Sequence, residues 1–362
     1  MVIQKRIICF LLVSCFCSVH AQESASTYEY RVKLIYKNIY RFFYDSSARL
    51  FIETNNIKSN ERPHAYLWPL CAFIQAANDM EQLQPDKKYM QPVVKAIGAY
   101  RSNKPPVPGY DSYVVKEGGG DRFYDDNQWI AIAYLDAYKR TGNKQFWEDA
   151  QEIYRFMMSG YDTVSGGGLY WKENDKTTKN TCSNGPGILI ALRLYQATKE
   201  KTYLDTAVLL YEWTNKYLLA PQGVYYDNIK LPGLHIDKRF YTYNAGTMLQ
   251  SNVLLYRITQ NKKYLQEAQR QASASLATFY KDGRFPSNYW FNAVLLRGYI
   301  ELYQVDGNKK YIQAMIDDLN KKWLTDLDQN NLAGPEKVKK LLDQAGLLEM
   351  VARIAFLQKN GF

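Results

Sequence analysis

Two adjacent carboxylates, Asp125 and Asp126, lie between aromatic side chains, with Tyr124 directly before them and Trp129 shortly after. An apolar run follows, so the pair is expected where a loop becomes a helix. Two carboxyl groups held a few ångströms apart can cleave a glycosidic bond, because one protonates the leaving oxygen while the other faces the developing oxocarbenium ion. A helix N-terminus also favours negative charge. Asp is a common N-cap, however, so helix capping is the alternative interpretation.

The first residues, 1–21, have the pattern of a secretory signal peptide. A charged start precedes an apolar run from Ile7 to Phe16, and a small-residue cleavage signature ends at Ala21. We therefore expect an exported protein, periplasmic or extracellular, whose mature chain begins at Gln22. The string Leu-Val-Ser-Cys at 12–15 also matches a lipoprotein cleavage box, which would put a lipid anchor on Cys15. No later stretch has the roughly 18–20 apolar residues that a transmembrane segment needs.

The few cysteines and histidines narrow the possible chemistry. Outside the signal segment the chain has two cysteines, Cys71 and Cys182, and two histidines, His64 and His235. A histidine-based metal centre and a Ser-His-Asp or Cys-His site are therefore not expected. The two cysteines could pair in an exported protein, but each lies in or beside an apolar helix, so buried free thiols are predicted.

Charge and aromatic content point away from nucleic acid and towards carbohydrate. The formal charge of +10 falls to +8 without the two basic residues of the signal segment, and the excess is spread over polar helix faces. No nucleic-acid motif accompanies it, so no such partner is expected. Aromatic residues make up 15% of the chain. Most must lie in the core, and the others suit a sugar cleft, where C–H faces stack on rings.

A repeated phrase runs through the mature sequence. Thr-Gly-Asn-Lys-Gln-Phe-Trp at 141–147 returns as Thr-Lys-Glu-Lys-Thr-Tyr-Leu at 198–204 and again from 259, and looser copies start near 86 and 307. The aromatic anchors stand 47 to 61 residues apart, a period that indicates a repeat architecture. Each unit pairs an apolar helix with an amphipathic helix. Helices that are apolar all round are buried, so an inner ring wrapped by an outer ring is predicted.

The pattern predicts an all-α fold, a closed (α/α)6 toroid of six inner and six outer helices. The helices are expected near 27–45, 66–80, 87–101, 126–140, 145–159, 183–198, 202–219, 244–259, 262–280, 289–304, 309–323 and 337–358, with no strand ladder between them. An open tetratricopeptide-type array would have shorter units of about 34 residues. One catalytic domain, residues 25–362, is predicted, and we expect a monomer.

Long loops precede the inner helices and should open one end of the ring into a cleft. Asparagines and aromatics recur at these helix starts, at Asn184, at Tyr243-Asn244 and around Trp290. They could simply be N-caps. Ring closure, however, would bring them to the same rim as the Asp pair, around one pocket.

Four strings resemble glycoside hydrolase family 76, the bacterial endo-α-1,6-mannanases and their fungal cell-wall transglycosidase relatives. They are Tyr-Asp-Asp-Asn-Gln-Trp at 124–129, Gly-Gly-Gly-Leu-Tyr-Trp at 166–171, Lys-Asn-Thr-Cys-Ser-Asn-Gly-Pro at 179–186 and Tyr-Thr-Tyr-Asn-Ala-Gly at 241–246. They occur in family order over roughly 120 residues. One departure is Ile130, where relatives often carry a second aromatic residue after the Trp.

The resemblance implies a retaining endo-α-1,6-mannanase that acts on an α-mannan backbone without a cofactor. Asp125 would be the nucleophile and Asp126 the acid/base. We expect Asp125 to stay ionised through backbone N–H bonds, and the pKa of Asp126 to be raised by the second carboxylate and by shielding. The alternatives are a transglycosidase, another toroid carbohydrate-active enzyme, or a glycan-binding lipoprotein that does not cut its ligand.

Binding roles follow from the same motifs and from the rim. Asp227, in a loop before an inner helix, fits a family position that grips sugar hydroxyls, with a turn Asp as the alternative. Trp171 is expected to be a stacking platform, with a buried packing Trp as the alternative. The predicted substrate-binding residues are Tyr124, Asn127, Trp129, Trp171, Asn184, Asp227, Tyr243 and Asn244.

Overall fold

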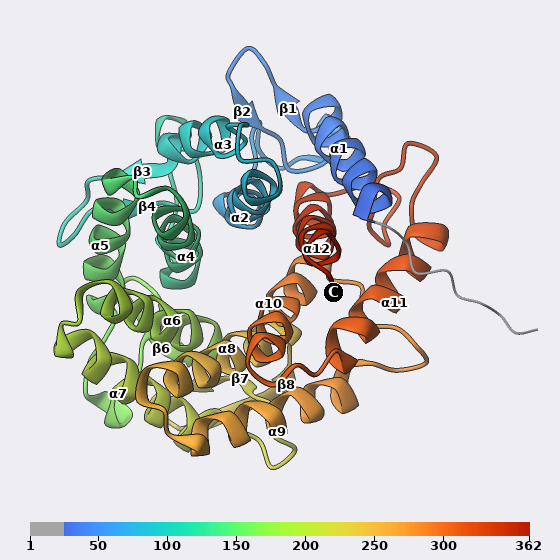
Figure 1. Ribbon diagram of the computed structural model, residues 1–362. Helices are drawn as coiled ribbons and strands as arrows, with labels where there is room; N and C mark the ends of the chain where they lie inside the picture. Colours follow the sequence, from blue (N-terminus) through green and yellow to red (C-terminus); the bar gives the residue numbers. More distant parts are fainter. Residues whose placement is uncertain (1–24) are drawn as a thin grey trace, which may run out of the picture.

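Twelve α-helices in two concentric rings make up most of the computed structural model, which describes residues 25–362 (Figure 1). The inner ring is formed by α2 (Leu67–Leu83), α4 (Tyr124–Thr141), α6 (Thr181–Thr198), α8 (Thr242–Thr259), α10 (Tyr289–Asp306) and α12 (Leu341–Lys359). The outer ring is formed by α1 (Ala25–Phe42), α3 (Met90–Ile97), α5 (Lys144–Met158), α7 (Lys201–Leu218), α9 (Lys262–Phe279) and α11 (Lys310–Thr325). The predicted signal segment and Cys15 lie outside the described residues.

The ring is closed, because α12 packs against α2 as well as against α10, and α1 packs on α12. This confirms the predicted (α/α)6 toroid. The two rings differ as their sequences indicated: in α4 every residue from Asn127 to Leu135 is buried, whereas α5 buries one stripe that includes Ala150, Ile153 and Met157. No helix within residues 25–362 is long and apolar enough to cross a membrane.

The repeated phrase forms the tight connection from four of the inner helices, α4, α6, α8 and α10, to the outer helices that follow them. The residues that end α4, α6, α8 and α10 all have left-handed backbone conformations, at Gly142, Lys199, Gln260 and Gly307. Each of these residues also donates its N–H to a carbonyl of the last helical turn, as helix C-termini commonly require. The side chains of Asn143 and Asn261 then cap the outer helices that follow.

Eight strands lie in the long loops, so the expectation of no strand ladder was wrong. Two small hairpins pair β1 (Tyr44–Asp45) with β2 (Leu50–Phe51) and β3 (Arg101–Ser102) with β4 (Gly109–Tyr110). A four-stranded antiparallel sheet has the order β5 (Tyr170–Lys172), β6 (Asp175–Asn180), β7 (Tyr226–Lys230) and β8 (His235–Phe240). Short 3₁₀ turns occur at Ile57–Ser59, Gly98–Tyr100, Val115–Glu117 and Val164–Gly166.

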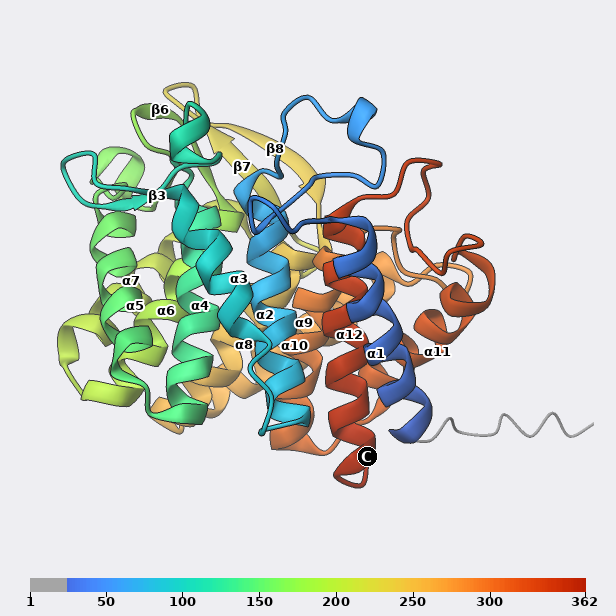
Figure 2. The same ribbon diagram turned by 90° about the horizontal axis from the view of Figure 1, so that it is seen from above.

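The sheet could not be predicted from the sequence, for a physical reason. Strand β6 reads Asp-Lys-Thr-Thr-Lys-Asn and lacks the apolar alternation of a half-buried strand. Its partner β7 comes from a different loop, some 50 residues further along the chain, and local patterns do not show such pairing. The sheet lies at the end of the toroid away from the C-terminus (Figure 2).

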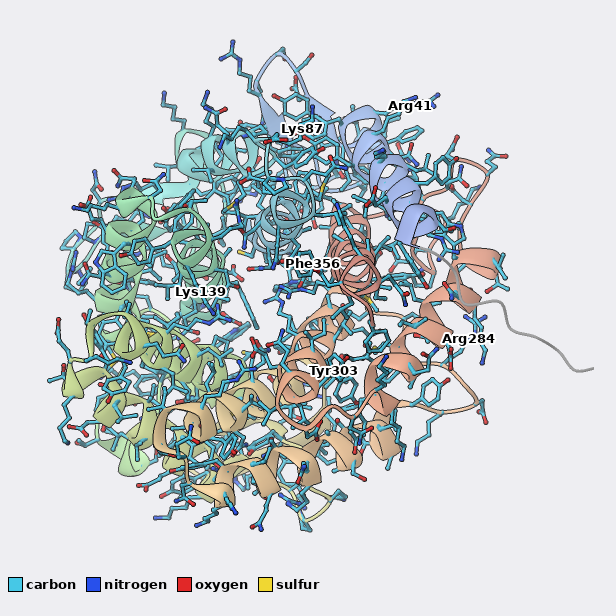
Figure 3. The ribbon with its side chains drawn as sticks, in the orientation of Figure 1. Arg41, Lys87, Lys139, Arg284, Tyr303 and Phe356 are labelled. Atoms are coloured by element: carbon cyan, nitrogen blue, oxygen red, sulfur yellow. The ribbon has the colours of Figure 1, made fainter. Side chains whose placement is uncertain are left out.

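The two ends of the toroid therefore differ. Figure 3 looks onto the end without the sheet, where Lys139, Tyr303 and Phe356, from the C-terminal parts of α4, α10 and α12, lie around the centre of the ring. The N-terminal ends of the inner helices meet the sheet at the far end. The positive ends of six parallel helix dipoles are thus gathered there, where the Asp pair lies.

Candidate active site

The carboxylate pair belongs to the first turn of α4. The N-cap is Phe123, whose backbone is extended, and Asp125 and Asp126 are the second and third residues of the helix. Asp125 Oδ1 accepts a hydrogen bond of 3.1 Å from the backbone N–H of Asp126. Neither carboxylate occupies the N-cap itself, so the capping interpretation does not account for the pair.

A cleft of about 660 Å³ opens above the pair. Five of the six inner helices contribute their second residue to its lining: Trp68 from α2, Asp125 from α4, Cys182 from α6, Tyr243 from α8 and Trp290 from α10. The complete lining is Tyr66, Trp68, Ser112, Asp121, Phe123, Asp125, Asp126, Trp129, Trp171, Thr178, Asn180, Cys182, Asp227, Asn228, Arg239, Tyr241, Tyr243, Trp290 and Phe291. Equivalent positions in the repeat therefore converge on one site, as ring closure predicts.

The four-stranded sheet forms one wall of this cleft. Trp171 on β5, Thr178 and Asn180 on β6, Asn228 on β7 and Arg239 on β8 all line the cavity. In the register of the sheet Asn180 lies directly opposite Asn228, so their side chains share one face. The wall is polar apart from Trp171.

The opposite face of the sheet is anchored by a buried lysine. Lys179 on β6 is fully buried and bonds to Asp162 Oδ1 at 2.9 Å and to the carbonyl oxygens of Val164 and Gly167 at 2.8 and 2.6 Å. Its ammonium group also lies 4.5 Å from the centre of the Tyr170 ring. The glycine-rich loop before β5 is thereby fixed, and Trp171 with it.

Burial raises the pKa values of both carboxyls, and hydrogen bonds to Asp125 set the two apart. Removal from water, countered by hydrogen bonds from Cys182, Trp171 and backbone N–H groups, raises the pKa of Asp125 from 3.8 to about 6. Removal from water and the charge of Asp125 raise the pKa of Asp126 well above its usual value. Asp125 is therefore the group that ionises more readily, and Asp126 is the group that holds its proton. The direction for Asp126 is as expected, but Asp125 keeps its charge largely through side-chain hydrogen bonds.

Trp171 both lines the cleft and touches the pair. Its indole Nε1 donates to Asp125 Oδ2 at 3.2 Å, and its ring centre lies 4.9 Å from that of Phe123. The side chain is 39% exposed. The alternative of a buried packing Trp is therefore wrong, and the exposed ring remains available to a ligand.

Asp227 also lines the cleft, but it lies on β7 and not in a loop as expected. Its carboxylate accepts from Asn228 Nδ2 at 3.0 Å and lies 3.6 Å from Arg239 Nη2. Burial nevertheless raises its pKa. Near it, the Tyr243 ring stacks on Phe291 with ring centres 4.0 Å apart, and Trp129 packs against Trp290 in the floor. Thus Trp129, Trp171, Asp227 and Tyr243 all line the cleft.

Tyr124, Asn127, Asn184 and Asn244 do not line the cleft, although all four were predicted to bind substrate. Tyr124 is buried against Phe156, with ring centres 5.1 Å apart, because the first residue of α4 faces the outer ring. Asn244 is buried beside Asp227, and its amide atoms have no hydrogen-bond partner among the described residues. Sequence spacing placed these residues at the rim but could not tell which way they face.

Asn127 and Asn184 act as backbone clamps. Asn127 Oδ1 accepts from the Tyr110 N–H at 2.7 Å and its Nδ2 donates to the Tyr110 carbonyl at 3.0 Å. Asn184 makes the same pair of bonds with Leu169, at 2.8 and 3.1 Å. Both are the fourth residue of an inner helix, and Gln344, the fourth of α12, holds Ala333 likewise. In these three helices the fourth position therefore fixes a loop, whereas the second position of five inner helices faces the cleft.

Several cleft residues were not predicted individually. Asn180, Asn228 and Arg239 lie on the sheet, which the sequence did not reveal. Cys182 was expected to be a buried free thiol, and both it and Cys71 are free and buried, but its place beside Asp125 was not foreseen. The signal that could have found it is its position two residues into α6, equivalent to Asp125 in α4.

The sequence of this chain matches the model of a known protein family over most of its length. The sequence model of glycosyl hydrolase family 76 matches residues 27–288. The chain belongs to glycoside hydrolase family 76. Mannan endo-1,6-alpha-mannosidase DCW1 of Saccharomyces cerevisiae is 30% identical over 175 residues, which are 44% of this chain and 39% of the yeast protein. The chain thus matches less than half the length of this yeast relative.

Solved structures agree with the fold over nearly the whole chain. The glycoside hydrolase family 76 mannosidase Bt3792 of Bacteroides thetaiotaomicron has a TM-score of 0.84 at 25% identity, covering 93% of this chain and 100% of that protein. The GH76A alpha-1,6-mannanase of Salegentibacter sp. HEL1_6 has a TM-score of 0.79 at 24% identity, covering 91% and 99%. An inactive variant of that mannanase, with two neighbouring aspartates replaced by asparagine, has been solved with alpha-1,6-mannotriose.

Proposed function

We propose that this family 76 protein is a retaining endo-α-1,6-mannanase that hydrolyses the α-1,6-linked backbone of mannan through a covalent mannosyl-enzyme. The observation that carries the proposal is the adjacent Asp125 and Asp126, with separated pKa values, at the base of an aromatic-lined cleft. The names of the yeast and bacterial relatives support the substrate class.

In the first step Asp125 attacks the anomeric carbon of the mannosyl unit that lies over it. The glycosidic bond to the neighbouring O6 breaks, and Asp126 donates its proton to that oxygen. The raised pKa of Asp126 supports this role, because a carboxyl group that is neutral at working pH can act as the general acid. Hydrogen bonds from Trp171 and Cys182 support the charge of Asp125 beforehand.

In the second step the roles of Asp126 reverse. As a carboxylate it takes a proton from a water molecule, and the resulting nucleophile attacks the anomeric carbon and displaces Asp125. Two inversions give net retention of the α configuration. The hydrogen bond between Trp171 Nε1 and Asp125 Oδ2 would stabilise the departing carboxylate. The chain's own side chains suffice for both steps.

The aromatic rings give the cleft the character of a sugar site. Trp171, Tyr243 and Phe291 line it, and the sheet wall offers amides and Arg239 for hydroxyl groups. We further propose that the protein is exported and works as a monomer on polymeric mannan outside the cytoplasm. Export rests on the signal-like pattern of residues 1–21.

The experiment that tests the proposal is product analysis on linear α-1,6-mannan, with the purified chain from Gln22 and its Asp125→Ala and Asp126→Ala variants. Short α-1,6-manno-oligosaccharides from the wild type, and none from either variant, are expected. Proton NMR during the reaction should show the α-anomer of the new reducing end first. Initial β-anomer would refute retention, and chain-lengthened products would favour a transglycosidase. Mannan bound but left intact by all three proteins would favour the binding-protein alternative.

A further inference from the structure

Asn180 occupies a helix N-cap without capping the helix. It is the residue before α6 and has the extended backbone of an N-cap, yet its side chain makes no cap hydrogen bond. Asparagine is among the preferred N-cap residues because its side-chain oxygen bonds to a free helical N–H. In the same chain Asn143, Asn261 and Asn288 all make that bond at their helices. The Asn180 side chain therefore does not stabilise the helix that it precedes.

The free oxygen of Asn180 lies in the wall of the cleft. The residue is 6% exposed, lines the cavity, and its Oδ1 has no hydrogen-bond partner among the described residues. A buried carbonyl oxygen without a donor costs free energy, and native proteins rarely leave one unpaired. A ligand that supplies a donor would remove this cost.

A second amide with the same property lies directly across the sheet. Asn228 is the register partner of Asn180, is also 6% exposed and lines the cleft, and its Oδ1 is likewise unpaired. The orientation of this amide is fixed, because its Nδ2 donates to Asp227 Oδ2 at 3.0 Å. Two acceptors therefore stand side by side on one face of the sheet.

The two amides line the same cavity as Asp125, the proposed nucleophile. Cys182, two residues after Asn180, lines the same cavity, and its thiol is hydrogen-bonded to Asp125. Asp227, the neighbour of Asn228, acts electrostatically on the same thiol. A sugar ring over Asp125 would thus bring its hydroxyls to the sheet wall.

We propose that Asn180 and Asn228 form a subsite that accepts hydrogen bonds from two neighbouring hydroxyl groups of the mannosyl ring lying over Asp125. The inference rests on the proposed function for the identity of the sugar. A mannosyl unit linked through C1 and O6 keeps free hydroxyls on C2, C3 and C4, so a vicinal pair is available to two adjacent acceptors. The pair would select for hydroxyl arrangement and so determine specificity.

The test uses α-1,6-mannobiosyl fluorides, whole and with single hydroxyls removed from the fluorine-bearing sugar. Loss of one neutral hydrogen bond should lower kcat/KM of Asn180→Ala about 2- to 12-fold on the whole substrate. With the one deoxy substrate that lacks the partner hydroxyl, the same substitution should have no further effect. Asn228→Ala should likewise lower kcat/KM on the whole substrate, and it should have no further effect on the substrate that lacks the adjacent hydroxyl.

A matched control separates binding from capping. Asn143→Ala removes a working cap on the outer helix α5, so it should lower the unfolding midpoint and leave kcat/KM unchanged. Asn180→Ala should lower kcat/KM and leave the unfolding midpoint unchanged. Wild-type kcat/KM in Asn180→Ala, or an equal loss on every deoxy substrate, would overturn the subsite.

Failure of the proposed function would be seen separately, as a wild-type chain that cleaves no α-1,6-mannoside. Calorimetry with α-1,6-mannotriose then decides the inference. Weaker binding by Asn180→Ala than by wild type would support the subsite, and equal binding or no binding by both would overturn it.

Discussion

Trp171→Phe should shift the acidic limb of the pH–rate profile. The substitution keeps an aromatic ring against Phe123 but removes the Nε1 donor that lies 3.2 Å from Asp125 Oδ2. That hydrogen bond favours the charged carboxylate, so its loss must raise the pKa of Asp125. Since Asp125 has to be ionised to act as the nucleophile, activity should require a higher pH.

The size of the shift follows from the bond that is lost. A hydrogen bond to a charged group contributes about 1.5–3 kcal/mol, and the 39% exposure of Trp171 argues for the lower end. One pKa unit corresponds to about 1.4 kcal/mol. The acidic limb should therefore move from about pH 6 to about pH 7, and kcat/KM at pH 5.5 should fall roughly 10-fold while the plateau changes less.

The assay is kcat/KM for an α-1,6-mannobiosyl fluoride between pH 4.5 and 8. Trp147→Phe, in the outer helix α5, is the matched control, because its ring packs on Tyr138 away from the cleft; its profile should equal that of the wild type. If Trp171→Phe lowers activity equally at every pH, Trp171 acts through stacking alone. That result would refute the proposed control of the Asp125 pKa.

Three further predictions concern stability. The raised pKa of Asp126 means that the folded state binds the proton more tightly than the unfolded state does. Stability therefore falls as pH rises above about 4. Asp126→Asn should raise the unfolding midpoint at pH 7.5 and change it little at pH 4. Asn127→Ala should cost about 2–3 kcal/mol in urea unfolding, because the buried backbone of Tyr110 loses both partners; a cost below 0.5 kcal/mol would contradict the clamp. Arg297→Met should cost about 1.5–3 kcal/mol, because buried Glu349 loses its hydrogen bonds from Arg297 and keeps Arg353 as its remaining cation. The double variant with Glu349→Leu should recover only part of that loss, because Arg353 loses its bond to Glu349 and keeps the one to Asp79.

The helices could be read from the sequence because their signals are local and repeated. Apolar helices alternate with amphipathic ones, and the turns between them carry the same phrase, so each predicted helix is present with ends within a few residues. The Asp pair was found for the same reason, since two acidic residues and their flanking aromatics are contiguous. The sheet was not predicted, because β6 pairs with β7 across about 50 residues and neither strand alternates clearly.

The orientation of individual side chains was the part that sequence could not supply. Asn127, Asn184 and Asn180 all stand at the start of inner helices, and all are of the residue type that caps helices or binds sugars. Two helical positions separate one outcome from the next. The fourth residue points back to its incoming loop, the second faces the cleft, and the residue before the helix can turn either way. Spacing within the repeat fixes the first two outcomes, and only the unused cap bond at Asn180 reveals the third. An asparagine that could stabilise its own helix but leaves its oxygen in a sugar-sized cleft gives up stability for binding, which is how functional sites commonly depart from the local rules that the rest of a fold obeys.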